Sequence, residues 1–161
     1  MYNNGIYSGL EWLFVMIYTK LTKLALKTSF DAHKNQTDKS GMPYIFHPFH
    51  LAEQMTDEET TAVALLHDVI EDTDYTLEDL AEMGFSDNVL RAIALMTHDE
   101  SVSYMDYVAQ IKTNPIARAV KLADLRHNSD MSRLDKVSTL DRERAEKYEK
   151  AIKLLESIDG N

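Results

Sequence analysis

Residues that interrupt helices are scarce in this chain of 161 residues, which contains five glycines and three prolines. Glycine and proline are the residues that most often end or break regular secondary structure. Between them the apolar residues recur mostly at the spacing of one helix face, and no run alternates convincingly as a strand does. We therefore expect an all-α fold, with helices over residues 10–32, 48–55, 58–71, 76–83, 87–96, 103–112, 115–130 and 138–158.

Local signals mark several of the expected helix ends. Thr76 and Asp79 have the spacing of a capping box, with Asp in the place of the usual Glu. Asn114 followed by Pro115 is typical of a helix start, and Gly84 fits a helix end. The sequence contains no repeat, low-complexity tract or linker. A single compact domain over residues 1–161 is the organisation that this length and pattern predict.

Composition excludes several classes of site and partner. The chain has no cysteine, so disulfides, thiolate zinc sites and cysteine nucleophiles are ruled out. A net charge of −10 argues against binding DNA or RNA backbones, although it leaves small phosphorylated ligands open. The early apolar stretch Trp12–Tyr18 has no basic leader and is too short to span a membrane. We expect a cytoplasmic protein that acts on no membrane; its oligomeric state stays open.

The segment His67-Asp68-Val69-Ile70-Glu71-Asp72 places acids and a histidine after the apolar run Ala62–Leu66. Buried charge is costly unless it is paired or bound to metal, so these groups need partners. On one continuous helix the four polar residues fall within a stripe of roughly 140°. We expect that face to offer both metal ligands and acid–base groups. The alternative is a buried helix with a solvated acidic end.

Two distant positions could complete a metal site begun by His67 and Asp68. His47 ends an irregular, polar loop over residues 35–48, which Gly41 and Pro43 keep from being helical. Asp124 interrupts an apolar pattern on a predicted helix. Two histidines and two aspartates suit a divalent ion of borderline hardness and leave room for water and substrate. Manganese, iron, magnesium and zinc all accept such ligands.

These residues match the H…HD…D pattern of the HD superfamily of metal-dependent phosphohydrolases. The chain also resembles, over most of residues 25–158, the hydrolase domain of RelA/SpoT-type enzymes. That resemblance rests on four blocks in order: Ala32-His33-x-x-Gln36, Lys39-Ser40-Gly41-x-Pro43-Tyr44-x-x-His47-Pro48, Leu65-Leu66-His67-Asp68-x-x-Glu71-Asp72-Thr73 and Lys121-Leu122-Ala123-Asp124-x-x-x-Asn128.

The resemblance implies an activity and a set of roles. Such enzymes remove the 3′-diphosphate of the stringent-response alarmone ppGpp as pyrophosphate, usually with Mn²⁺. It implies that Glu71 and Asp72 position and deprotonate the attacking water. The implied metal ligands are His47, His67, Asp68 and Asp124. Residues near the phosphates, sugar or base of a small nucleotide would be Lys39, Asn128, Arg144 and Tyr148. His33 is implied to be structural or to support the site, and His50, His98 and His127 to be surface, core or rim residues.

The chain departs from the family pattern at Asp38 and at Leu125-Arg126, which replaces the usual basic-then-apolar order. Asp38 stands where these hydrolases usually carry an arginine that stacks on guanine and attracts phosphate. A carboxylate can do neither, and its charge would repel a polyphosphate. Three hypotheses follow: hydrolysis of ppGpp or pppGpp, the same chemistry on another small nucleotide or phosphate ester, and a helical nucleotide sensor with a structural metal. Glu71 and Asp72 argue against the sensor, because a structural metal site needs no water-activating pair.

Overall fold

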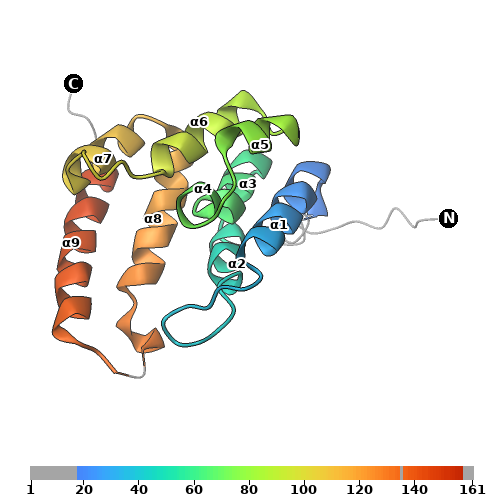
Figure 1. The fold of residues 1–161 in the computed structure, drawn as a ribbon. Helices are drawn as coiled ribbons and strands as arrows, with labels where there is room; N and C mark the ends of the chain where they lie inside the picture. Colours follow the sequence, from blue (N-terminus) through green and yellow to red (C-terminus); the bar gives the residue numbers. More distant parts are fainter. Residues whose placement is uncertain (1–17, 135, 158–161) are drawn as a thin grey trace, which may run out of the picture.

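The computed structural model describes residues 18–134 and 136–157, and these form helices joined by short loops (Figure 1). Strand pairing within the described residues is limited to one isolated bridge between Thr37 and Pro43. The all-α prediction is confirmed. In chain order the elements are α1 (Lys20–His33), α2 (Phe46–Ala52), α3 (Glu58–Leu66), α4 (Val69–Asp72), α5 (Leu77–Glu82), α6 (Asp87–Met96), α7 (Tyr104–Lys112), α8 (Pro115–Ser129), the 3-10 helix η3 (Met131–Arg133) and α9 (Thr139–Glu156).

The predicted end signals act as expected. The Thr76 side chain accepts from the backbone N–H of Asp79 while Asp79 accepts from that of Thr76, which completes the capping box of α5. The Asn114 side chain accepts from the first free N–H groups of α8, and Pro115 occupies the first turn. Gly84 follows α5 with a φ of 95°, a left-handed conformation that favours glycine.

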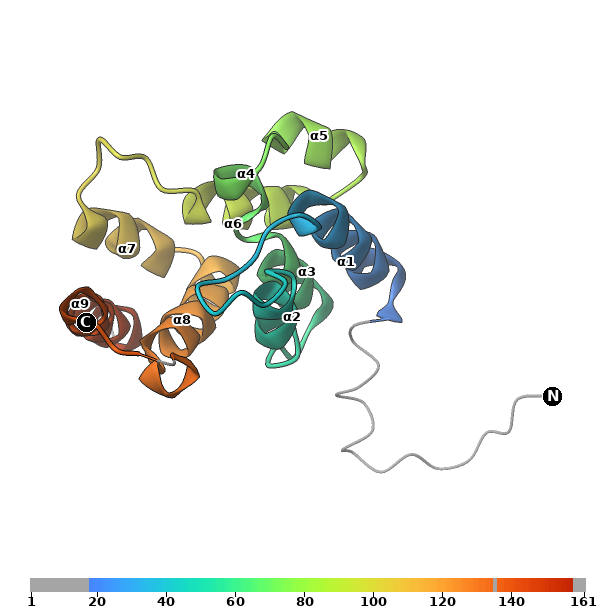
Figure 2. The ribbon, with the colours of Figure 1, turned by 60° about the horizontal axis from the view of Figure 1, so that its bottom comes forward.

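Helix α3 is the centre of the molecule. Every residue from Thr60 to Leu66 is buried, so this helix is enclosed on all sides rather than amphipathic. It packs against α1, α2, α6 and α8, which surround it in both views (Figures 1 and 2). The end of α3 therefore lies in the interior, and any polar residue placed there is fixed by packing.

Helix α8 lies between two parts of the fold (Figure 2). On one side it packs against α3, and on the other it runs alongside α9. The described residues share one hydrophobic core, to which both parts contribute. That the whole of residues 1–161 is one domain stays a prediction, because the ends lie outside the described residues. No helix within residues 18–134 and 136–157 is long and apolar enough to cross a membrane.

The continuous helix predicted over residues 58–71 is wrong. Helix α3 ends at Leu66, the chain turns at His67 and Asp68, and α4 begins at Val69. The Nδ1 atom of His67 lies 2.8 Å from the carbonyl oxygen of Ala64, the acceptor that a continuing helix would offer to the N–H of Asp68. This local side-chain bond competes with the helix and accompanies its end. The polar residues therefore do not form one helical stripe.

The other predicted helices are found with small shifts at their ends. Within the described residues the largest is at the segment predicted over residues 48–55, where α2 runs from Phe46 to Ala52. Helix α1 begins at Lys20. Thr19 caps it by accepting from the backbone N–H of Thr22. Residues 10–17 of the helix predicted over residues 10–32, and residue 158 of the last predicted helix, lie outside the described residues. Over the described part, sequence periodicity located the helices and local capping placed their ends.

Candidate metal centre and substrate cleft

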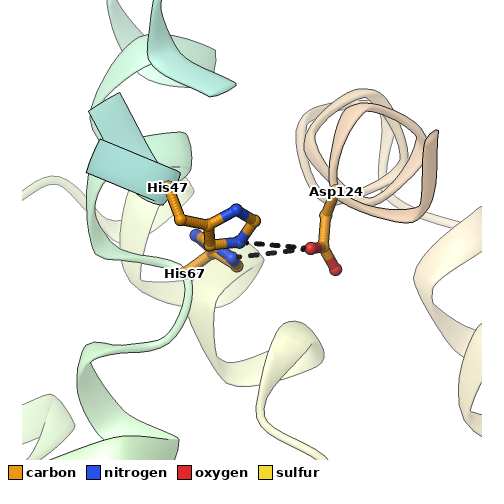
Figure 3. A group of neighbouring side chains, drawn as sticks. All are labelled: His47, His67 and Asp124. Atoms are coloured by element: carbon orange, nitrogen blue, oxygen red, sulfur yellow. Dashed lines mark ion pairs between the residues drawn. The ribbon is translucent and has the colours of Figure 1, made fainter. Parts of the chain in front are cut away.

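Three side chains from three elements converge at the centre of the molecule (Figure 3). His47 lies near the start of α2, His67 follows the last residue of α3, and Asp124 lies within α8. Their ligand atoms lie within 4.8 Å of one another, so the group could hold a metal ion. The Asp124 Oδ1 atom lies 3.4 Å from His47 Nε2 and 4.0 Å from His67 Nε2. All three side chains are largely buried, with 9%, 1% and 5% of their surface exposed.

Asp68 adds a second carboxylate to this group. Its Oδ2 atom lies 2.9 Å from His67 Nε2 and 3.8 Å from His47 Nε2, and it accepts a hydrogen bond from the Tyr44 hydroxyl. The structure thus brings together all four residues that were predicted as metal ligands. We refer to His47, His67, Asp68 and Asp124 as the four-residue cluster.

The protonation of His67 suits metal binding. Its Nδ1 faces the carbonyl of Ala64, and because a carbonyl only accepts, Nδ1 must carry the proton. In the neutral ring Nε2 then has a free lone pair aimed into the cluster. Although Asp68 Oδ2 is 2.9 Å away, Nε2 is buried and makes no well-aligned hydrogen bond. A buried nitrogen without a hydrogen-bond partner, together with the neighbouring carboxylates, forms a set of ligands that suits a divalent cation.

Opposite charges perturb the pKa values inside the cluster. Burial alone lowers the pKa of His67, but the charge of Asp68 and its contact with the ring outweigh this and raise it to about 9. Burial likewise raises the pKa of Asp68, and His67 overrides that effect and lowers it to about 2. Without a metal, a proton on His67 balances the carboxylate. A divalent ion would replace that proton.

Neighbouring residues hold the ligands in place. Lys121 Nζ lies 2.9 Å from Asp124 Oδ2, and its charge lowers the pKa of that carboxyl despite burial. The Asn128 amide donates to Asp124 Oδ1 at 2.5 Å. On the other side, the Nδ1 atoms of His47 and His127 lie 2.8 Å apart. Asp124 and His47 thus have fixed orientations, as outer partners commonly provide for metal ligands.

Some of these supporting residues escaped the sequence prediction. Lys121 is three residues before Asp124 on α8, and this helical spacing could have indicated the contact. Tyr44 and His127 reach the cluster only because the loop before α2 folds onto the end of α3 and onto α8. His127 had been interpreted as a core, surface or rim residue, and its contact with His47 gives it a definite place. The linear sequence gives no signal for the His127 contact, whereas Tyr44 stands in the block that carries the family resemblance.

Glu71 and Asp72, the predicted water-activating pair, lie on the exposed side of the cluster. Glu71 Oε2 accepts from the backbone N–H of His98 at 3.1 Å, which fixes its carboxylate. The carbonyl of Asp72 accepts from Gln36 Nε2 at 2.8 Å, and Gln36 Oε1 in turn lies 2.7 Å from His33 Nδ1. His33 thus contacts the acidic segment through Gln36, and its supporting role stays a prediction. Burial, followed by the charges of Asp68 and Glu71, raises the pKa of Asp72.

Two hollows meet beside the cluster and share Tyr44, Asn128 and Tyr148. The first, of about 350 Å³, lies between the loop after α1 and the helix α9. The second, of about 240 Å³, lies between the acidic residues and the wall formed by α7, α8 and α9. The first hollow is further lined by Asp38, Lys39, Ser40, His47 and Arg144, and the second by Asp68, Glu71, Asp72, His98, Tyr104, Tyr107, Lys121, Asp124 and Lys147.

The predicted substrate contacts all border the first hollow. Lys39 and Arg144 line it from opposite sides, and Asn128 and Tyr148 stand at its junction with the second. Lys39 is 62% exposed and lies 3.8 Å from Asp141, so it bridges the loop to α9. The sequence therefore predicted a set of residues that the fold does gather, although their contact with a ligand stays a prediction.

Asp38 has a structural task in its loop. Its Oδ1 atom accepts from the backbone N–H groups of Ser40 and Met42 at 2.8 and 2.9 Å. The turn also includes Gly41, whose φ of 78° favours glycine. The carboxylate lines the first hollow while it holds the loop. An arginine could not accept these two bonds, so the departure from the family pattern alters the loop as well as the charge.

Comparisons with known proteins agree with this geometry. A family model described as HD domain matches residues 25–143. The mouse guanosine-3′,5′-bis(diphosphate) 3′-pyrophosphohydrolase MESH1 is 30% identical over 158 residues, 88% of each chain. The Aquifex aeolicus protein of the same enzyme name is 34% identical over 135 residues, which are 76% of this chain and 18% of that protein.

A solved structure shares the fold. It belongs to a metazoan orthologue of SpoT that is described as hydrolysing ppGpp, and it superposes with a TM-score of 0.65 at 23% identity. The match covers 98% of this chain and 92% of that one. This likeness shows that the two chains share one helical fold, the scaffold on which the cluster is built.

Proposed function

We propose that this chain, which belongs to the HD domain family, is a metal-dependent phosphohydrolase that removes the 3′-diphosphate of ppGpp or pppGpp as pyrophosphate. One observation carries the proposal: Asp68 and Asp124 of the four-residue cluster line the same hollow as Glu71 and Asp72. Ligands and proton acceptors are thus adjacent in one cleft. The enzyme names of the mouse and Aquifex relatives favour this substrate.

His47, His67, Asp68 and Asp124 would hold one divalent ion. Such an ion lowers the pKa of water and offsets charge on phosphate oxygens. We propose Mn²⁺, because the mixed imidazole and carboxylate donors suit a metal of borderline hardness; iron, zinc or magnesium would fit the same donors. The buried, unsatisfied Nε2 of His67 supports an ion at this position.

Glu71 and Asp72 would orient the attacking water and take its proton. The backbone N–H of His98 holds the Glu71 carboxylate in place, so this carboxylate is already oriented before the substrate binds. The raised pKa of Asp72 makes it a better proton acceptor than an ordinary aspartate, which suits proton transfer. As the water oxygen bonds to phosphorus, the bond from phosphorus to the ribose 3′ oxygen breaks, and that oxygen gains a proton.

The nucleoside would occupy the first hollow. Arg144 and Lys39 supply cations for the 5′ phosphates, Tyr148 offers a ring face, and Asn128 stands where the sugar approaches Asp124. These cations also explain how a chain with a net charge of −10 can admit a small polyphosphate. A cytoplasmic location, action away from nucleic acid polymers and membranes, and a role in the stringent response belong to the same proposal.

The test is direct. The purified protein is loaded with Mn²⁺ and supplied with ppGpp, and the release of GDP and pyrophosphate is measured against a metal-stripped control. We expect turnover that depends on metal and is abolished by Asp68→Ala. Full metal loading with no turnover of ppGpp or pppGpp would overturn the proposal.

Asp38 favours a second candidate, the same chemistry on another small nucleotide or phosphate ester. Its carboxylate lines the hollow assigned to the nucleoside, where the related hydrolases carry an arginine. A panel of nucleotides compared in the parent protein and in Asp38→Arg separates the two. A preference for a non-guanine phosphate that persists in Asp38→Arg would support the second candidate. The sensor hypothesis would be excluded by hydrolysis that Glu71→Gln removes while metal stays bound.

A further inference from the structure

We infer that the second hollow is a subsite for the terminal phosphate of the 3′-diphosphate, bound by the Lys147 ammonium and the Tyr104 hydroxyl. This inference deepens the proposed function and rests on it for the orientation of the substrate. It assigns to the wall formed by α7 and α9 the task of distinguishing a diphosphate from a monophosphate at the reacting end.

Lys147 is held at this hollow by aromatic rings. Its Nζ atom lies 4.3 Å from the ring centroid of Tyr104 and 5.6 Å from that of Tyr148. Contacts of this kind orient an ammonium group without neutralising it. Among the described residues Lys147 pairs with no carboxylate. The hollow therefore presents a positioned cation whose charge is available to a ligand.

Tyr104 contributes an unsatisfied donor. Its hydroxyl is buried and has no hydrogen-bond partner among the described residues. A buried polar atom without a partner is uncommon, because its lost hydration is not repaid. The residue lines the second hollow together with Lys147, so both border the space that an anion would occupy. A phosphate oxygen would satisfy the hydroxyl.

The neighbouring tyrosine and lysine are already engaged. The Tyr107 hydroxyl donates to the backbone carbonyl of Met96, and its ring lies beside Lys121, 5.6 Å from Nζ to the centroid. Lys121 itself lies 2.9 Å from Asp124 Oδ2. These two residues therefore support the ligand Asp124, whereas Lys147 and Tyr104 remain for the substrate.

Charge balance gives the reason for such a subsite. Asp68, Glu71, Asp72 and Asp124 all line the second hollow, and they would repel a diphosphate that approaches them. A divalent ion held by the four-residue cluster would offset part of this repulsion near the reacting phosphorus. The terminal phosphate is joined to that phosphorus through a bridging oxygen, and it needs a cation of its own. Lys147, on the opposite wall of the hollow, supplies a cation for the terminal phosphate.

A binding experiment tests the subsite without requiring turnover. Pyrophosphate and inorganic phosphate are titrated separately into the Mn²⁺-loaded protein by calorimetry, and metal content is measured afterwards because pyrophosphate also binds Mn²⁺. We expect Lys147→Met to weaken pyrophosphate binding about tenfold or more and to change phosphate binding by less than about threefold. Tyr104→Phe should weaken pyrophosphate binding several-fold. Lys150→Met, an exposed lysine on α9 that lines neither hollow, is the matched control.

A kinetic arm uses ppGpp and its analogue with a single 3′ phosphate. Lys147→Met should lower kcat/KM for ppGpp and leave the value for the analogue nearly unchanged. Equal losses for both, or pyrophosphate binding as tight as in the parent, would overturn the subsite. So would a parent protein that keeps its metal and binds no pyrophosphate. Pyrophosphate binding that depends on Lys147, in a protein that turns over no alarmone, would support the subsite and refute the proposed substrate.

Discussion

The residues that face the metal position and those that face the nucleoside are built in opposite ways. His47, His67 and Asp124 are between 1% and 9% exposed and come from or adjoin the packed helices α2, α3 and α8. Lys39 lies in a loop and is 62% exposed, and its Nζ atom lies 3.8 Å from Asp141 Oδ1 on α9. The first set is fixed by the core, whereas the second is attached to the surface.

The difference separates two kinds of change. A substitution among the buried ligands disturbs metal, charge balance and packing together, because each side chain has several partners. A substitution of Lys39 in the loop or of Arg144 on α9 alters mainly contacts with the substrate. The residues that carry the reaction therefore tolerate little change. The residues that contact the nucleoside can change with less effect on the rest of the protein. The following predictions test that separation in order of expected size.

The largest effect is expected from His67→Ala. Removing the ring takes away a donor and leaves Asp68 without the group that balances its charge, so both metal binding and turnover should fall to the level of the metal-stripped protein. Metal content and activity are measured together. His50→Ala, an exposed histidine outside the group of potential ligands, should keep its metal. A His67→Ala protein that retains stoichiometric metal would contradict the buried site.

Glu71→Gln should separate chemistry from metal binding. The amide keeps the shape of the side chain but cannot take a proton, so kcat should fall by roughly 10²–10⁴-fold, the range for general base catalysis. Metal content should remain that of the parent, because Glu71 is outside the four-residue cluster. Circular dichroism checks the fold. Loss of metal in this variant would show that the acidic pair belongs to the ligand set.

The pH dependence of stability tests the charge balance of the metal-free cluster. His67 has its pKa raised from 6.5 to about 9, so its protonated form stabilises the native state fully below pH 6.5. That contribution is lost as the pH rises through about 9. We expect the free energy of unfolding to fall by on the order of a few kcal/mol over this window. Urea denaturation of the stripped protein measures it.

Two comparisons sharpen that measurement. His67→Gln removes the titrating group, so its free energy of unfolding should be nearly flat across the same window. In the parent, metal binding displaces the proton from His67, and the apparent affinity for metal should therefore increase with pH up to about 9. A parent protein whose stability is as flat as that of His67→Gln would refute the raised pKa.

The smallest effects are expected at the surface of the first hollow. Arg144→Ala should raise KM about tenfold, equivalent to about 1.4 kcal/mol, with kcat nearly unchanged. Lys39→Ala should raise KM by less, because its exposed ammonium is screened by water and lies close to Asp141. Arg142→Ala, on α9 but outside both hollows, is the control. A fall in kcat as large as that of Glu71→Gln would show that these residues take part in the reaction.

Sequence alone determined the helical class, most helix positions and the four potential ligands. Helix periodicity and capping depend on neighbours within a few residues, so Thr76, Asn114 and Pro115 carry their structural meaning in the linear chain. The four potential ligands were predicted because His67-Asp68 is a local motif. His47 precedes it and Asp124 follows it, in the order of the family pattern that the chain resembles. What the pattern could not specify was the break between α3 and α4, where a side-chain bond to Ala64 competes with the helix.

The tertiary structure decided which groups surround that motif. Tyr44 and His127 reach the cluster because the loop before α2 folds onto the end of α3 and onto α8. Lys147 and Tyr104 share a hollow because α7 and α9 pack against each other and against α8. Such contacts join residues far apart in the chain, and their energies depend on burial and distance, which no local spacing encodes. The sequence therefore determined the chemistry available to this protein, and packing decided where charge is unbalanced and a phosphate can bind.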